Sequence, residues 1–297
     1  ALATPLMSQV LTTLFHLPSS KWITIAILGV TCVFYTYALL HGMKGISLLA
    51  KSCMYLFFAL LAYVLFLGGE TRYILETGFA AVGNLAQNFL GLATFTDPQR
   101  TTSFPQTWTI FYWAYWMVWC VASPFFIGSI SRGRTVRQTI LGGYACCVSA
   151  TCLSFIILGN YSLGLQVSGK LDVAIYAAGN DLYTTIISII QTLPLAPLVL
   201  VLLIVAMVAF YATSFDSIAL VASSYTYRQI TGDEEPHNAV KAFWAIMLIL
   251  LPMALVFSDS SMANLQSVSI IAAFPVAFVI LLIIASFLKD ASDYLKS

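Results

Sequence analysis

The sequence predicts an all-α, polytopic integral membrane protein. Of its 297 residues, 60% are hydrophobic and 8% are charged, and the mean hydropathy is +0.91. A soluble domain of this length carries far more polar surface. Apolar stretches of about 20 residues recur, which is the length a helix needs to cross a bilayer core of roughly 30 Å. Strands are excluded because an open sheet edge cannot satisfy its backbone groups in lipid.

Membrane-length helices are predicted wherever a long apolar run is bounded by polar residues or helix breakers. They cover residues 21–40, 46–68, 106–130, 138–160, 195–225, 239–257 and 264–288, after the tail of a first helix at 2–16. Residues 71–95 and 172–192 alternate apolar and polar positions at helical period, which predicts amphipathic helices along the membrane surface. Pro194 and Pro197 fit the first turn of the helix that follows.

Helix breakers mark where irregular backbone is expected within these spans. They are Pro124 and Gly128 in 106–130, Gly142, Gly143 and Gly159 in the next span, and Pro252 and Pro275 in the last two. A proline inside a helix removes one backbone hydrogen bond and kinks the helix. Broken helices line substrate or ion sites in transporters, whereas a single proline in most membrane proteins is only a packing kink.

Positive charge in the short loops predicts the orientation of the spans. With the spans above, the basic clusters fall on one side, which is therefore predicted to be cytoplasmic. They are His41 with Lys44, Arg132 with Arg134 and Arg137, Arg228 with Lys241, and Lys289 with Lys296. The loops at 69–105, 161–180 and 258–263 are then external. The basic loop at 131–137 also suits anionic lipid headgroups, or pairing with Asp233, Glu234 and Glu235.

Several classes of function find no support in the residues. The net charge of +1 gives no reason to expect nucleic acid, and no nucleophile–base pair, phosphate loop or carboxylate dyad points to an enzyme or an organic cofactor. The six cysteines form no CxxC pair, and no histidine completes a metal pattern. They are predicted to be small buried hydrophobic residues. The chain begins at Ala1 without an initiator methionine, which suggests a piece of a longer protein.

The span 106–130 carries aromatic side chains at its middle as well as at its ends. Tyr112, Trp116 and Trp119 follow i, i+4, i+7 and share one helical face, and Tyr115 flanks that face. Interfacial anchoring accounts for Trp and Tyr at the ends of a span but not at its centre. A wall of electron-rich rings binds a cation that cannot donate hydrogen bonds, such as a quaternary ammonium. A packed helix–helix interface accounts for the same pattern.

The span 195–225 carries three polar residues, Thr213, Ser214 and Asp216. A carboxylate inside a span is costly, so Asp216 is expected to be functional or paired near the cytoplasmic interface. The adjacent hydroxyls of Thr213 and Ser214 offer oxygen ligands, which hard cations prefer. The alternative is that both hydroxyls bond back to carbonyls one turn earlier in their own helix.

Two stretches resemble the signature of the betaine/choline/carnitine transporter family (BCCT). They are Trp-Thr-Ile-Phe-Tyr-Trp-Ala-Tyr-Trp at 108–116 and Ile-Ser-Arg-Gly-Arg-Thr-Val-Arg at 130–137. Residues 44–46, 213–217 and 265–271 resemble other parts of the family, so the resemblance runs along the whole chain.

The resemblance implies an amino-acid-transporter-like (LeuT-type) fold, built from two inverted five-helix repeats that follow two extra helices. Residues 1–70 would then end the first repeat, 71–105 would form an external connecting helix, and 106–291 would form the whole second repeat, before a cytoplasmic tail at 292–297. An N-terminal part would be missing. The resemblance also implies a homo-oligomer, a trimer, in the bacterial inner membrane.

The resemblance further implies roles for individual residues. Trp116 and Trp119 match positions that box a trimethylammonium group, and Tyr112 and Tyr115 accompany them. Tyr115 replaces the family's usual tryptophan, which leaves the exact substrate open. In sodium-coupled members, the positions of Phe210, Thr213 and Ser214 form part of a sodium site.

Together the residues and the resemblance predict a secondary active transporter for betaine, choline or carnitine, coupled to Na⁺ in symport. Within 106–130 and 195–225 no lysine or arginine replaces the ion. The alternatives are a sodium-independent substrate/product antiporter, a receptor or sensor that binds a quaternary ammonium without transporting it, and a purely structural membrane subunit.

Overall fold

The chain is all-helical in the computed structural model, which describes residues 4–18, 20–102, 104–228, 235–257 and 262–296. It divides into two compact units, the first formed by 1–87 with 133–258 and the second by 88–132 with 259–297. Each is considered by itself. The elements are α1 (Thr4–Phe15), α2 (Lys21–Leu40), α3 (Gly42–Leu67), α4 (Thr71–Thr94), the π-helix η1 (Pro105–Ile110), α5 (Phe111–Ile130), α6 (Val136–Ser154), the π-helix η2 (Phe155–Gly159), α7 (Asn160–Ser168), α8 (Val173–Gly179), α9 (Leu182–Gln191), α10 (Ala196–Tyr225), α11 (Asn238–Phe257) and α12 (Met262–Lys296).

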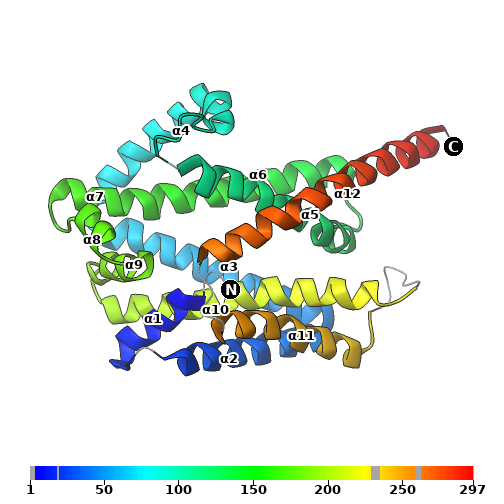
Figure 1. Ribbon diagram of the computed structural model, residues 1–297, viewed down its shortest axis with the longest axis horizontal. Helices are drawn as coiled ribbons and strands as arrows, with labels where there is room; N and C mark the ends of the chain where they lie inside the picture. Colours follow the sequence, from blue (N-terminus) through cyan, green and yellow to red (C-terminus); the bar gives the residue numbers. More distant parts are fainter. Residues whose placement is uncertain (1–3, 19, 103, 229–234, 258–261, 297) are drawn as a thin grey trace. The chain divides into compact units, whose positions relative to one another are not determined.

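The first unit is organised around α10, which packs against α2, α3 and α11 (Figure 1). The buried face of α10 carries small side chains at Ala206, Ala209, Ala212 and Ala219. Small residues let helix backbones approach closely, which is the main source of packing between helices in a membrane. The face therefore fixes α10 firmly between its neighbours.

A small apolar core and a group of polar contacts join several helices of the first unit. The core joins residues of α3, α4, α7 and α10 around Val64, Ile74, Tyr161 and Val199. Lys170 Nζ lies 2.7 Å from Glu70 Oε1, which also accepts a hydrogen bond from Ser168 Oγ. The pair holds the segment after α3 to the segment after α7.

The second unit pairs α5 with α12, two helices that are far apart in the sequence. The segment formed by η1 and α5 is bent. Its two parts, Pro105–Cys120 and Ser123–Ile130, meet at an angle of 57°. Pro124 cannot donate to the carbonyl of Cys120, and Ser123 Oγ donates to Trp119 O at 2.8 Å. Both features are known local causes of helix bending, so the predicted break at Pro124 is confirmed.

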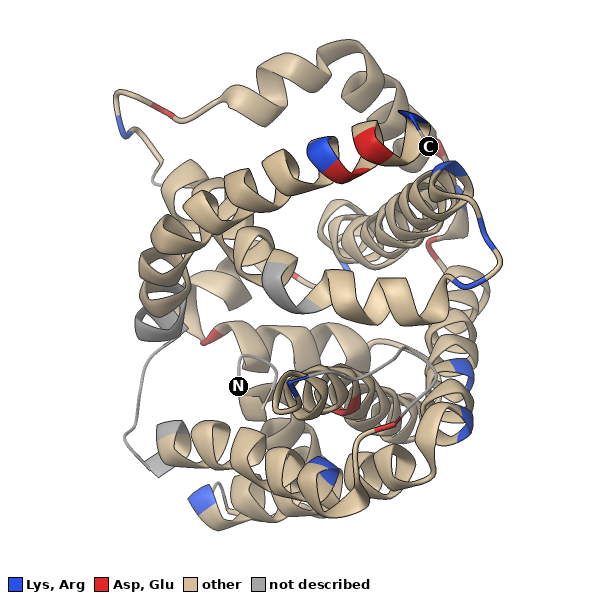
Figure 2. Cartoon of the chain, turned by 90° about the vertical axis from the view of Figure 1, so that its right-hand side faces the viewer, with Lys and Arg blue, Asp and Glu red and all other residues tan. Residues whose placement is uncertain are grey.

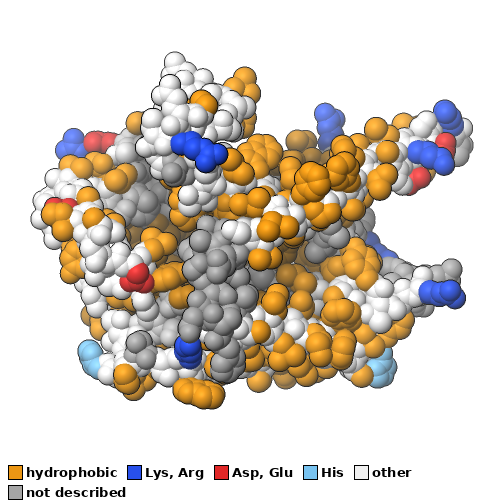
Figure 3. All heavy atoms as spheres, viewed as in Figure 1, with side chains coloured by type: hydrophobic (Ala, Val, Ile, Leu, Met, Phe, Trp, Pro, Cys, Tyr) orange, Lys and Arg blue, Asp and Glu red, His pale blue; other side chains and the backbone are white. Residues whose placement is uncertain are grey.

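Among the described residues, five helices are long and apolar enough to cross a membrane, or six if the bent pair counts as one span. Helix α11 (Asn238–Phe257) occupies the predicted 239–257. Charged residues lie mainly near helix ends and in loops (Figure 2). Apolar side chains, including Phe243 and Leu251 of α11, are exposed on the outside of the helices (Figure 3). The predicted all-α polytopic membrane protein is thus confirmed, whereas the inverted repeats and their boundaries stay predictions.

The predicted single helix at 172–192 is wrong, because two short helices occupy it. Asp181 caps α9 by accepting a hydrogen bond from Thr184 N at 3.2 Å, and Asn180 is extended. An acidic N-cap starts a new helix because it satisfies a free backbone N–H group. Pro197 lies in the first turn of α10 as predicted, but Pro194 precedes that helix.

Candidate functional site

The aromatic residues of α5 form one cluster with Tyr115 at its centre. The ring centroid of Tyr115 lies 5.6 Å from that of Phe111, 5.7 Å from Trp116, 6.3 Å from Trp119 and 6.5 Å from Tyr112. Three of these contacts are edge-on, the arrangement that ring quadrupoles favour. The sequence placed Tyr115 at the flank of the face, whereas the contacts make it the residue that joins the other rings.

The cluster presents ring surface instead of burying it. Trp116 is 63% exposed and Tyr112 44%, while Tyr115 and Trp119 are half-buried within the second unit. Phe111 is almost completely buried and supports Tyr115 from one turn earlier. Sequence reasoning missed Phe111, although its i−4 spacing from Tyr115 signals the contact.

Irregular backbone flanks the cluster on both sides. The π-helix Pro105–Ile110 precedes it, and the 57° bend follows Trp119 within one turn. Such π-helical turns and breaks occur frequently at functional sites, because they re-aim side chains and release backbone groups. The rings therefore stand on the kind of interrupted helix that lines substrate sites in transporters.

The predicted sodium ligands lie together on α10 in the first unit. Thr213 Oγ1 donates to Phe210 O at 2.9 Å, and Ser214 Oγ donates to the same carbonyl at 3.1 Å. This is the back-bonding arrangement of the alternative prediction. It also gathers three oxygens in one place, and a hydroxyl that donates its proton keeps lone pairs that accept a cation. The sodium role stays a prediction.

Asp216 is completely buried one turn further along α10. Its Oδ1 accepts a hydrogen bond from Ser217 Oγ at 3.0 Å, and its Oδ2 has no hydrogen-bond partner among the described residues. No ion pair joins it to any residue that the structure describes. The expected pairing near the interface is therefore not found in that part of the chain.

Metal-binding clusters and the cysteine thiols are the remaining candidate groups. No group of three or more His, Cys, Asp or Glu side chains that would hold a metal occurs among the described residues. All six cysteines are free, and Cys53 is buried as predicted. The prediction of burial is wrong for Cys120, Cys146 and Cys147, which are exposed on α5 and α6.

The basic loop keeps its charges exposed. Gly133 has φ +77°, which turns the chain into α6, and Thr135 and Gln138 form a reciprocal capping box. Arg134 and Arg137 are exposed beside it. Glu235, one of the acidic residues considered as partners of this loop, binds Lys241, and the role of the basic loop stays a prediction. Asp233 and Glu234 lie outside the described residues, as do residues 258–261 of the predicted external loop.

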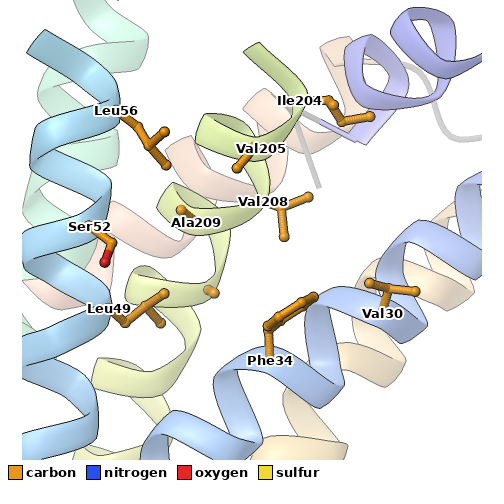
Figure 4. A pocket seen from close by; sticks show the side chains of 10 residues that line it. Val30, Phe34, Leu49, Ser52, Leu56, Ile204, Val205, Val208 and Ala209 are labelled. Atoms are coloured by element: carbon orange, nitrogen blue, oxygen red, sulfur yellow. The ribbon is translucent and has the colours of Figure 1, made fainter. Parts of the chain in front are cut away.

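An apolar cavity of about 330 Å³ lies between α2, α3 and α10 (Figure 4). Its lining is apolar apart from Ser52, and Phe34 is the one aromatic ring among the ten lining residues. A single ring and one hydroxyl make no aromatic box, so the cavity is a poor site for a quaternary ammonium. The sodium candidates and this cavity belong to the first unit, and the aromatic cluster belongs to the second.

Comparison with known proteins adds an independent line of evidence. A family model described as "BCCT, betaine/carnitine/choline family transporter" matches residues 1–296. Glycine betaine transporter 2 of Vibrio parahaemolyticus is 30% identical over 93% of this chain and 50% of its own length. The glycine betaine transporter OpuD of Bacillus subtilis is 30% identical over 94% and 53%.

Other relatives are named for different substrates. An ectoine/hydroxyectoine transporter of Virgibacillus pantothenticus is 29% identical over 96% of this chain and 56% of its own length. A carnitine transporter of Acinetobacter baumannii is 25% identical over 93% and 50%. The chain thus spans about half the length of the curated relatives it matches. With the family model covering almost every residue, this chain belongs to the betaine/carnitine/choline transporter family.

Proposed function

We propose that the protein containing this chain is a secondary active transporter for a quaternary ammonium compound, with betaine, choline and carnitine as the candidate substrates. The observation that carries the proposal is the exposed ring cluster around Tyr115, Trp116 and Trp119 on an interrupted helix of a family of transporters.

The chemistry of the cluster suits this class of substrate. A quaternary ammonium carries charge but no N–H group, so hydrogen-bond acceptors gain little from it. Aromatic faces attract it through their quadrupoles, and the attraction grows as water is excluded. Tyr115 keeps a ring face and adds a hydroxyl that can donate to a substrate carboxylate.

We further propose Na⁺ as the coupling ion. The three oxygens of Phe210, Thr213 and Ser214 supply hard ligands, and the remaining ligands would come from other parts of the full-length protein. The bacterial inner membrane, contact with its lipids and a homo-oligomeric state, a trimer by family resemblance, complete the proposal.

Uptake by the full-length protein in proteoliposomes tests the proposal. Radiolabelled substrate should accumulate when an inward sodium gradient is applied and should not accumulate when potassium replaces sodium. Accumulation that persists without sodium but requires substrate inside the vesicles would favour antiport. Saturable binding without flux would favour a receptor and contradict transport.

A further inference from the structure

Asp216 presents a chemical problem that the proposed sodium ligands leave unsolved. Its side chain has 0% exposure, in a 30-residue apolar helix. At 1.5 Å per residue it lies about 8 Å from the centre of that helix. An ionised carboxylate at this depth needs a partner, because removing an unpaired charge from water is among the most costly events in folding.

Local groups satisfy only one of the two carboxylate oxygens. Ser217 Oγ lies 3.0 Å from Oδ1 and 2.8 Å from the backbone oxygen of Thr213, and its one proton is shared between these two acceptors. Oδ2 is buried and has no hydrogen-bond partner in the part of the chain that the structure describes. Native proteins rarely leave such an atom unsatisfied, so an unpaired buried oxygen indicates a missing partner.

The surroundings of Asp216 place its carboxylate beside the Thr213 turn of α10. Ser217 Oγ lies within hydrogen-bond distance of both Asp216 Oδ1 and the backbone oxygen of Thr213. Thr213 is at the same time one of the proposed sodium ligands, so the carboxylate lies one turn from the oxygens that gather around the Phe210 carbonyl.

We propose that Asp216 is the anionic member of the monovalent-cation site on α10, with Oδ2 providing the negative charge that draws Na⁺ to Thr213, Ser214 and the Phe210 carbonyl. The proposal rests on the proposed sodium coupling and deepens it. Neutral hydroxyl and carbonyl oxygens can coordinate an ion but cannot compensate its charge in a low-dielectric span. A buried carboxylate one turn away provides that compensation, and the cation in turn removes the cost of burying Asp216.

Thermal unfolding of the purified full-length protein tests the proposal without any transport measurement. The melting temperature is followed in detergent while NaCl replaces N-methylglucamine chloride at constant ionic strength, with KCl as a second series. A ligand that binds only the folded state raises the melting temperature in a saturable way. We expect Na⁺ to do so in the unmodified protein. Asp216→Asn should raise the half-saturating Na⁺ concentration at least about tenfold, because it removes the charge and keeps the shape.

Two further variants make the result decisive. Glu76→Gln removes a carboxylate that is exposed on α4 and should leave the Na⁺ response unchanged. Asp216→Glu keeps the charge but displaces it by one methylene, and should weaken the response even if Asp216→Asn yields no folded protein. An unchanged Na⁺ response in either Asp216 variant, or a response of the unmodified protein that KCl reproduces in full, would overturn the proposal. The absence of any response of the unmodified protein to Na⁺ would overturn it as well.

Failure of this site and failure of sodium coupling are distinguishable. Sodium-independent uptake together with Na⁺-dependent melting that requires Asp216 would contradict the coupling and retain the site. Sodium-dependent uptake with melting that ignores Asp216 would contradict the site and retain the coupling.

Discussion

Lys241 Nζ lies 2.9 Å from Glu235 Oε2, although the lysine side chain is only 2% exposed. Its ammonium also approaches the carbonyl of Leu39, at the end of α2, at 3.5 Å. Glu235 in turn accepts a hydrogen bond from Met43 N at 3.3 Å. One ion pair therefore connects the turn between α2 and α3 to the start of α11.

The two members of this pair should respond differently to substitution. Glu235→Gln leaves a buried ammonium without its counter-charge and should destabilise the protein by roughly 1–3 kcal/mol. Lys241→Met leaves a carboxylate that is 45% exposed and can be hydrated, so its effect should be smaller. Chemical denaturation of the purified full-length protein in detergent measures both. A larger loss for Lys241→Met would show that packing of the lysine stem matters more than the charge.

The same pair should make stability depend on pH. The hydrogen bond from Lys241 holds the pKa of Glu235 below its ordinary value of about 4.3. The folded state therefore binds fewer protons than the unfolded state, so the stabilisation is fully present above that ordinary value and is lost as pH falls through the lowered pKa. The melting-temperature difference between the unmodified protein and Glu235→Gln should shrink as pH falls from 5 to about 3. A difference that stays constant would show that the pair contributes no proton-linked stability.

Gly42 should tolerate no side chain, because of the same carboxylate. Its φ is +65°, and a Cβ atom there would lie 2.6 Å from Glu235 Oε1. Gly42→Ala should therefore destabilise the protein by at least about 1–2 kcal/mol from backbone strain alone. The matched control is Gly142→Ala in α6, where a Cβ atom would meet nothing within 4 Å and helix propensity favours alanine. Equal effects of the two substitutions on thermal unfolding would contradict both the backbone strain at Gly42 and the importance of its close approach to Glu235.

The arginine-rich loop should face the cytoplasm. In a background where the exposed Cys120, Cys146 and Cys147 are replaced by serine or alanine, Thr135→Cys should react with an impermeant thiol reagent in inside-out vesicles only. Labelling in intact cells would reverse the orientation.

Local pattern was enough to place most helices. The predicted spans 21–40 and 195–225 match α2 and α10 to within a residue, because long apolar runs with polar boundaries determine them. The break at Asn180 and Asp181 was missed because a single N-cap interrupts a pattern that remains periodic on both sides. The pair of Glu235 with Lys241 was missed for another reason. Glu235 also contacts the turn at Gly42, nearly two hundred residues away, and contacts between residues so far apart in the chain leave no local pattern in the sequence.

The candidate site was predicted in its residues but not in its arrangement. Helical spacing identified the aromatic face of α5, and the three oxygens of α10 came from adjacent polar residues and the family resemblance. The central position of Tyr115 and the unpaired oxygen of Asp216 depend on rotamers and on neighbouring helices, which spacing alone does not specify.

Binding of the transported quaternary ammonium substrate by the α5 rings is the proposal on which the predicted function rests. Its most direct test is concentration-dependent uptake of radiolabelled betaine, choline and carnitine by the full-length protein in proteoliposomes, compared with Trp116→Leu, Trp116→Tyr and Trp119→Ala. A desolvated cation–π contact contributes about 2 kcal/mol, so loss of the ring should raise the apparent KM by about 30-fold, whereas tyrosine should cost far less. Saturable uptake with an unchanged KM in Trp116→Leu would contradict the claim and leave the rings as a helix-packing surface.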